Sequence, residues 1–283
     1  MIFILFTSLL INQIWAANQA IYGEDNRVDV YQSSNELLKE LSYSTAAMIP
    51  HENLVTVADR VQIRGQLYKD MYRLCPEEKF RDQISAAYCS GTLIDKDIIL
   101  TAGHCVSNSM DCPSNAWVFD FRAQSQIQKS VTVPSNSVYQ CKRVIYYQVD
   151  LHSNIDFAII KLDRPVTDRK AVNIRLGEKF NAKDKLALIG HPRGLPTKIA
   201  ANGSLIENGE GFIKTNLDAF SINSGSGVFN QTTGELEGIL VSGLNDFDED
   251  KQRNCIKSKV YTDKEGAEVV TRVEAVWKYI DQL

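Results

Sequence analysis

The sequence predicts an all-β fold, and two observations lead to this prediction. Short runs of apolar and β-branched residues recur along the chain, and turn residues such as Asn202-Gly203 and Thr233-Gly234 separate them. Helical periodicity is clear only near the C-terminus. Short strands at this density favour a β-sandwich or barrel over a parallel α/β sheet. We expect strands over residues 54–57, 87–94, 98–102, 117–121, 143–149, 157–162, 185–189, 211–215, 227–230 and 236–242.

One amphipathic helix is predicted over residues 269–283. Its apolar residues recur at spacings of three and four, which is the period of one helix face. They are Val269, Val270, Val273, Val276, Trp277, Ile280 and Leu283. We expect this face to pack against the β body.

The length and the charge balance limit the function classes. With 283 residues, 44% of them apolar, the chain can build a sizeable core in one large domain. Its 31 basic and 35 acidic residues leave a net charge of −4. This balance disfavours a nucleic-acid partner, because nucleic-acid-binding proteins usually carry a basic face.

The N-terminus has the pattern of a signal peptide. Residues 1–16 contain no charged side chain, and residues 2–11 form an apolar run that is too short to span a bilayer. Small residues follow, so we expect cleavage after Ala16 or Ala20 and a secreted or periplasmic protein. A buried N-terminal strand is the alternative. The polar residues 21–50 are interpreted as a strap or pro-segment, and residues 51–283 as the main domain.

Three short segments combine a chemically active side chain with a defined local context. His104 follows an apolar run, Asp156 begins another, and Ser224 lies in a Gly-rich turn before a third. The segments are TAGHC at residues 101–105, NIDFAIIKL at 154–162 and NSGSGVFN at 223–230.

These motifs resemble those of the chymotrypsin-like serine peptidases, most closely the bacterial glutamyl endopeptidase and exfoliative-toxin branch. The order His104, Asp156, Ser224 matches, and the resemblance covers roughly residues 54–283. It implies two packed six-stranded antiparallel β-barrels with a C-terminal helix, and an active site between the barrels. It also implies a monomeric serine endopeptidase that acts on protein or peptide substrates. No cofactor or metal is expected, and no membrane attachment after signal removal.

The resemblance assigns a role to each residue. Ser224 is the expected nucleophile, and His104 the base that takes its proton and returns it to the leaving amine. Asp156 would hold the other ring nitrogen of His104. The backbone N–H groups of Ser224 and Ile222 would form the oxyanion hole.

The two residues before Ser224 bear on the expected activity. Ile222 stands where the family usually has glycine, and a β-branched residue disfavours the positive φ of a tight turn. We therefore expect a hole that is strained, flipped or formed only on substrate binding, and the alternative function is a catalytically weak or inactive binding or toxin-like protein. Asn223 stands where trypsin-type zymogens have aspartate. Since asparagine cannot pair with a new N-terminal ammonium, we expect activity without that switch.

The specificity of the expected peptidase depends on a second group of residues. Leu240 occupies the place of a histidine that binds acidic side chains in the glutamyl branch, so a preference for glutamate is not expected. Asp218 lies six residues before Ser224, as in trypsin-like members that bind basic side chains. We expect a basic preference, and the alternative for Asp218 is a loop hydrogen bond. The residues expected to bind substrate are Asp218, Leu240, Val241, Ser242 and Gly243.

The six cysteines fit an exported protein. Cys89 and Cys105 match the family's disulfide beside the catalytic histidine. The other four are Cys75, Cys112, Cys141 and Cys255, and their three pairings stay open, with Cys112–Cys141 among them. No Cys-x-x-Cys pair is present, which disfavours a zinc site. The acidic residues 245–250 are interpreted as a solvated loop, with a calcium site as the alternative.

Overall fold

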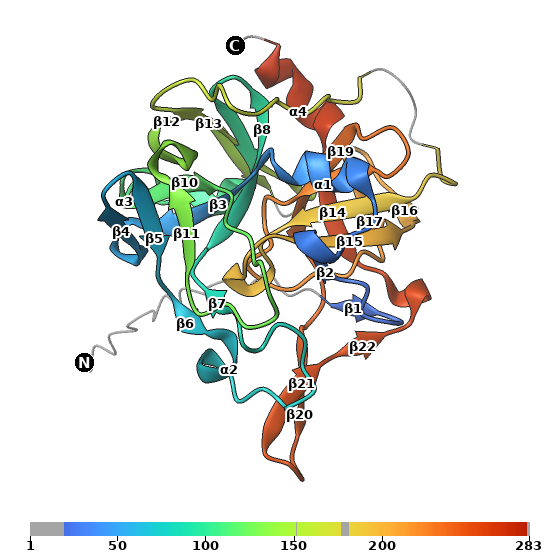
Figure 1. The fold of residues 1–283 in the computed structure, drawn as a ribbon. Coiled ribbons are helices and arrows are strands. Elements are labelled where there is room, and N and C mark those ends of the chain that lie inside the picture. Colours follow the sequence, from blue (N-terminus) through green and yellow to red (C-terminus); the bar gives the residue numbers. More distant parts are fainter. Residues whose placement is uncertain (1–19, 151, 177–180, 282–283) are drawn as a thin grey trace, which may run out of the picture.

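The computed structural model describes residues 20–150, 152–176 and 181–281. Its strands form two main units, and the first is a closed six-stranded barrel in the order β10-β12-β13-β9-β8-β3 (Figure 1). The strands of the barrel are β3 (Thr45–Pro50), β8 (Cys89–Asp95), β9 (Ile98–Thr101), β10 (Asn115–Phe119), β12 (Val138–Asp150) and β13 (Ile155–Leu162).

The second unit is an eight-stranded sheet in the order β16-β17-β23-β19-β18-β14-β15-β2. Its strands are β2 (Val28–Asp29), β14 (Leu186–Gly190), β15 (Lys198–Gly203), β16 (Leu205–Asn208), β17 (Phe212–Thr215), β18 (Gly227–Asn230), β19 (Leu236–Ser242) and β23 (Glu268–Arg272). The second closed six-stranded barrel that the resemblance implied is thus an open sheet. Strand β2 from the N-terminal segment forms one edge and β16 forms the other, so six inner strands lie between them.

Smaller sheets and short helices surround the two units. The remaining strands are β1 (Ile21–Tyr22), β4 (Leu54–Val57), β5 (Arg60–Ile63), β6 (Gln66–Leu67), β7 (Ile84–Ser85), β11 (Val131–Pro134), β20 (Phe247–Asp250), β21 (Cys255–Ser258) and β22 (Val260–Tyr261). The α-helices are α1 (Glu36–Ser42), α2 (Tyr68–Met71), α3 (Asp111–Ser114) and α4 (Val273–Ile280), and short 3-10 helices such as Gly103–Val106 lie between strands. The all-β prediction is confirmed, and each predicted strand run overlaps an observed strand.

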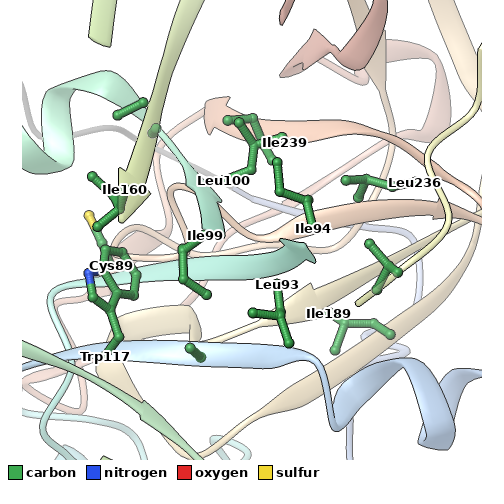
Figure 2. Close-up of a cluster of buried hydrophobic side chains, with 14 of the residues drawn as sticks. Cys89, Leu93, Ile94, Ile99, Leu100, Trp117, Ile160, Ile189, Leu236 and Ile239 are labelled. Atoms are coloured by element: carbon green, nitrogen blue, oxygen red, sulfur yellow. The ribbon is translucent and has the colours of Figure 1, made fainter. Parts of the chain in front are cut away.

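One continuous core joins the barrel to the sheet. Leu93 and Ile99 from the barrel and Ile189 and Ile239 from the sheet are fully shielded from solvent and belong to the same cluster, as Figure 2 illustrates. Apolar burial of this kind contributes roughly 25 cal/mol per Å². The shared core fixes the two units relative to each other, so side chains from both can meet at one site.

The C-terminal helix is shorter than predicted. Strand β23 includes Val269 and Val270, and Val270 pairs with Ile213 of β17 and Leu240 of β19. The spacing of Val269 and Val270 fits a helix, but β-branched residues also suit a strand. Because β23 pairs with β17 on one side and β19 on the other, these two residues form a strand. Helix α4 begins only at Val273, and its predicted end at Leu283 lies outside the described residues.

The N-terminal segment is more structured than a polar strap. Strand β3 is one of the six strands of the barrel, so the barrel starts before the predicted boundary at residue 51. Helix α1 begins after Asn35, whose side chain accepts a hydrogen bond from the Leu38 amide at 3.1 Å. Strand β1 pairs with β22 in a separate two-stranded sheet, and β2 pairs with β15 at the edge of the eight-stranded sheet. The predicted signal peptide falls on residues 1–19, outside the described residues, apart from Ala20.

Three disulfides cross-link the described residues. They are Cys89–Cys105, Cys112–Cys141 and Cys75–Cys255. The pairing expected from the resemblance is therefore confirmed. No helix in the described ranges is long and apolar enough to cross a membrane.

His191 makes the fold sensitive to acid. Its ring is fully buried, stacks on Phe121 and lies 3.0 Å from the Leu195 carbonyl through Nδ1. Burial lowers the pKa of His191 to about 3. Below about pH 6.5 the unfolded chain therefore binds a proton that the folded chain does not, so acidification lowers the free energy of unfolding.

We expect His191→Gln to reduce this acid sensitivity. Each pH unit in the window corresponds to about 1.4 kcal/mol, so between pH 6.5 and 4.5 the wild type should lose about 2 kcal/mol more than the variant. Urea unfolding of both proteins at the two pH values measures the difference. Equal losses in the two proteins would show that His191 does not remain neutral in the fold.

Candidate active site

His104 and Asp156 are brought together by neighbouring strands of the barrel. Strand β13, which begins at Ile155, pairs with β9, and the chain turns from β9 into the short helix Gly103–Val106. A side chain at Gly103 would meet the Gln148 carbonyl oxygen at 2.3 Å, so only glycine allows this close approach. The sequence TAGHC thus folds so that His104 faces the head of β13.

The Asp156 carboxylate contacts His104 twice. Oδ2 lies 2.5 Å from the Nδ1 atom of His104, and Oδ1 accepts from the His104 backbone N–H at 3.0 Å. The Asp156 amide donates to Thr271 Oγ1 at 3.0 Å, which ties the residue to β23. A carboxylate only accepts hydrogen bonds, so this contact keeps a proton on Nδ1 and leaves Nε2 available as a base.

The turn that carries Ser224 is attached to the strands that lead to His104. The Ser90 amide of β8 donates to the Ser224 carbonyl at 2.8 Å, and the Cys105 sulfur lies 3.9 Å from the same oxygen. Gly225 has a φ of 81°, and a side chain there would collide with the Ser90 carbonyl. The structure therefore brings together the three segments that the sequence singled out, two from the barrel and one from the sheet.

Ile222 adopts the backbone conformation of a glycine. Its φ is 73°, in the left-handed region, and its side chain is half-buried. This conformation costs roughly 1–2 kcal/mol for a residue with a β-carbon. Three hydrogen bonds shape the turn. The Asn223 amide donates to the Phe220 carbonyl at 3.1 Å, and Ser226 donates to Asn223 twice, through its amide to the carbonyl at 3.0 Å and through Oγ to Oδ1 at 2.6 Å.

An ion pair between a partly buried arginine and a buried aspartate, which sequence reasoning missed, stabilises this turn. Arg193 pairs with Asp246, whose carboxylate accepts from the amide of Ser221 at 3.1 Å and from its hydroxyl at 3.2 Å. The Arg193 amide also donates to the Ser221 carbonyl at 2.7 Å. We call these three residues the turn brace. Because Ser221 directly precedes Ile222, the brace restrains the backbone that carries the two amides of the expected oxyanion hole.

Asp246 therefore does not belong to a solvated acidic loop. It is only 3% exposed, and burial raises its pKa to about 6, although the Arg193 charge opposes this shift. Asp248 and Glu249 in the same segment are exposed, as the sequence predicted, but they belong to strand β20 rather than to a loop. The sequence carried no local signal for the brace, because Arg193 and Asp246 are distant in the chain.

Asp218 is covered by the N-terminal segment. Its two carboxylate oxygens accept from the amides of Tyr22 at 2.7 Å and Asn26 at 2.8 Å, and the residue is 1% exposed. Burial raises the pKa of Asp218 to about 6. The Tyr22 hydroxyl donates to Glu268 Oε1 at 3.0 Å, so the segment bridges two buried carboxyl groups. Asp218 thus makes hydrogen bonds to a neighbouring segment, which is the alternative to substrate binding that the sequence left open.

The other residues expected to bind substrate differ in exposure. Leu240 and Val241 are buried in the core, whereas Ser242 and Gly243 are partly exposed. Leu240 is nevertheless tied to the Ser224 turn, because its carbonyl accepts from the Gly225 amide at 2.7 Å. Within residues 240–243, only Ser242 and Gly243 are therefore accessible to a ligand.

Metal binding at this site is disfavoured by the chemistry of its ligands. Within the described parts of the chain, the one convergent group of possible ligands is Cys89, His104 and Cys105. Its two sulfur atoms are joined in a disulfide, and a disulfide does not supply the thiolates that metals prefer.

Comparisons with known proteins identify the family and the fold. A family model described as "Trypsin-like peptidase domain" matches residues 89–239. The solved structure of a Glu endopeptidase in complex with MPD has a TM-score of 0.54 and 18% identity, and the match covers 93% of this chain and 98% of that chain. The serine endoprotease from Yersinia pestis has a TM-score of 0.51 and 16% identity, and the match covers 89% of this chain and 66% of that chain.

At 16–18% identity, the similarity to these two solved structures shows a shared fold and no more. A search of curated proteins finds no significant match. The family model, however, spans more than half of the sequence. The chain belongs to the trypsin-like peptidase family.

Proposed function

We propose that this protein is a serine endopeptidase that hydrolyses peptide bonds through an acyl-enzyme on Ser224. The observation that carries the proposal is the double contact of Asp156 with His104, next to the docked Ser224 turn. Family membership supports a peptidase with protein or peptide substrates.

In the proposed mechanism, Nε2 of His104 takes the hydroxyl proton as Ser224 attacks the scissile carbonyl. Asp156 stabilises the imidazolium that forms and keeps the ring oriented. The amides of Ile222 and Ser224 donate to the developing oxyanion. His104 then protonates the leaving amine, and a water molecule attacks the acyl-enzyme by the same route in reverse.

The alternative is a catalytically weak binding protein, for which Ile222 was the argument. Its positive φ speaks for the enzyme, because the backbone takes the conformation that the tight turn requires despite the β-carbon. The turn brace supplies the restraint that offsets the cost of this conformation.

A basic preference stays a prediction. For Asp218 to meet a substrate cation, Tyr22 and Asn26 would have to give up their hydrogen bonds to its carboxylate. Export to an oxidising compartment is part of the proposal, supported by the three disulfides.

A fluorophosphonate probe tests the proposed function directly. We expect covalent labelling of the folded wild type and none of Ser224→Ala, since only an activated serine reacts with this probe. Intact-mass spectrometry measures the adduct, and peptide mapping places it. A folded wild type that stays unlabelled would favour the binding protein.

A further inference from the structure

A cavity of about 450 Å³ is lined by the N-terminal segment and by the segment that leads into β7. Residues 27–29 and Gln32 form one part of its lining, and residues 78–83 with Gln126 form the rest. We call it the Arg27 cavity. Its volume lies within the range of pockets that bind small molecules. None of the roles assigned above to the active site uses it.

Arg27 brings an unused hydrogen-bond donor to this cavity. The residue is 3% exposed, and its Nε and Nη2 atoms donate to the Asp25 carboxylate at 2.9 and 2.7 Å. Since these two atoms share one edge of the planar guanidinium, Nη1 points away from Asp25. Nη1 is buried and has no hydrogen-bond partner among the residues that the structure describes. A buried donor of a charged group is costly to leave unpaired, and an anion is its strongest acceptor.

Arg81 brings a second such donor from the other segment. Its Nε atom is buried and unpartnered within the described ranges, and no ion pair found there involves its guanidinium. The backbone of Arg81 is anchored, because its carbonyl accepts from the Lys69 amide at 3.0 Å. Lys79 adds a third positive charge to the lining, and its Nζ atom donates to the Arg27 carbonyl at 3.3 Å. The two segments that form the cavity are therefore joined to each other.

Each of the three carboxylates in the lining is engaged by a donor from outside it. The pairs are Asp29 with Lys198 at 2.7 Å, Asp82 with Lys69 at 2.5 Å, and Glu78 with the Ser258 amide at 2.9 Å. Lysines thus offset two of the three negative charges, and the third carboxylate is hydrogen-bonded. The unpartnered donors of Arg27 and Arg81 remain, and they favour an anionic ligand.

Phe80 fixes the arrangement of these cations. It lines the cavity and has a φ of 60°, in the left-handed region that a residue with a β-carbon rarely adopts. The Cζ atom of Arg27 lies 5.7 Å from the centroid of its ring, and Nζ of Lys198 lies 4.7 Å from it. Strained backbone of this kind is concentrated at ligand sites. The donors of the cavity are therefore held in place before a ligand arrives, which favours binding.

We infer that the Arg27 cavity binds a small tetrahedral oxyanion of the phosphate or sulfate class, held by Arg27 and Arg81. A tetrahedral oxyanion presents acceptor oxygens in several directions, so it can accept from guanidinium groups of two segments at once. A carboxylate directs both of its oxygens to one side. Binding there does not require peptidase activity, so the site is independent of the proposed function.

Calorimetry of the folded wild type at constant ionic strength tests the site, with inorganic phosphate, sulfate and acetate as separate titrants. We expect saturable one-to-one binding of phosphate and sulfate, and acetate at least tenfold weaker. Arg81→Gln should weaken phosphate binding about tenfold or more, because it removes a charge-assisted donor. Arg81→Lys should lose less, since it keeps the charge without the fork of donors. Glycerol 2-phosphate distinguishes the sources: equal affinity indicates a phosphate carried on a larger molecule, and weaker binding indicates the free ion.

Control variants complete the experiment. Arg143→Gln removes the same charge from an exposed position of β12 and should leave phosphate binding unchanged. Lys79→Gln, at an exposed position of the cavity, should weaken binding about threefold and replaces Arg81→Gln if that protein does not fold. Ser224→Ala should bind phosphate like the wild type, whatever the result of the peptidase assays. A wild type without saturable phosphate binding, acetate that binds as tightly as phosphate, or full binding by the folded Arg81→Gln protein would overturn the inference.

Discussion

Replacing Ser224 with alanine is expected to lower kcat for peptide hydrolysis by about a million-fold. The reason is that nucleophile and base act as one unit, so only the residual catalysis by substrate binding and the oxyanion amides remains. His104→Ala should cost about as much, and the double variant should be no slower than either single variant. Peptide hydrolysis by the purified proteins, with rates normalised to folded protein, gives these values.

Ser226→Ala serves as the comparison within the same turn. Ser226 is buried and donates to Asn223, so its loss disturbs the turn but leaves the hydroxyl of Ser224 in place. We expect this variant to keep fluorophosphonate labelling at Ser224. Full activity in Ser224→Ala, or additive losses in the double variant, would show that His104 and Ser224 do not act together.

Breaking the turn brace should give the second-largest effect. In Arg193→Met the Asp246 carboxylate loses its cation, and the backbone from Ser221 to Ile222 loses a restraint. Loss of one oxyanion donor lowers kcat by about 10²–10³, and we expect a decrease of this size with little change in KM. A peptide aldehyde, which forms an oxyanion on the enzyme, should lose affinity by a similar factor.

The control separates this effect from general destabilisation. Arg253→Met breaks an exposed ion pair with Glu77 and should change neither kcat nor aldehyde affinity. Arg193→Lys should recover part of the activity, because it restores the charge without the full guanidinium geometry. An Arg193→Met protein that is less stable but binds the aldehyde normally would contradict a role of the brace in the oxyanion hole.

The strands could be predicted from the sequence because their signal is local. Runs such as Gly227–Asn230 and Leu236–Ser242 carry their pattern within a few residues, and the structure has them with the same bounds. The end of the chain shows the limit of this reasoning. Val269 and Val270 fit a helix face and a strand equally well, and the pairing partners that decided for the strand lie far away in the sequence.

The candidate site divides in the same way. His104, Asp156 and Ser224 were recognisable because each lies in a short motif, and the order of the motifs narrowed the family. The brace between Arg193 and Asp246 and the cover that Tyr22 and Asn26 place over Asp218 had no such signal. They depend on which loops meet when the barrel and the sheet pack together.

The sequence by itself therefore determined the strand content, the family resemblance and the three residues expected to act on a peptide bond. Only the tertiary structure decided that the second sheet stays open between edge strands β2 and β16. It also decided that the turn brace restrains the backbone at Ile222 and that Asp218 bonds to the N-terminal segment. The physical reason is the range of the interactions involved. Local periodicity and short motifs depend on residues that are neighbours in the sequence. Ion pairs such as Arg193–Asp246 and the hydrogen bonds that cover Asp218 depend on residues that come together only when the core packs.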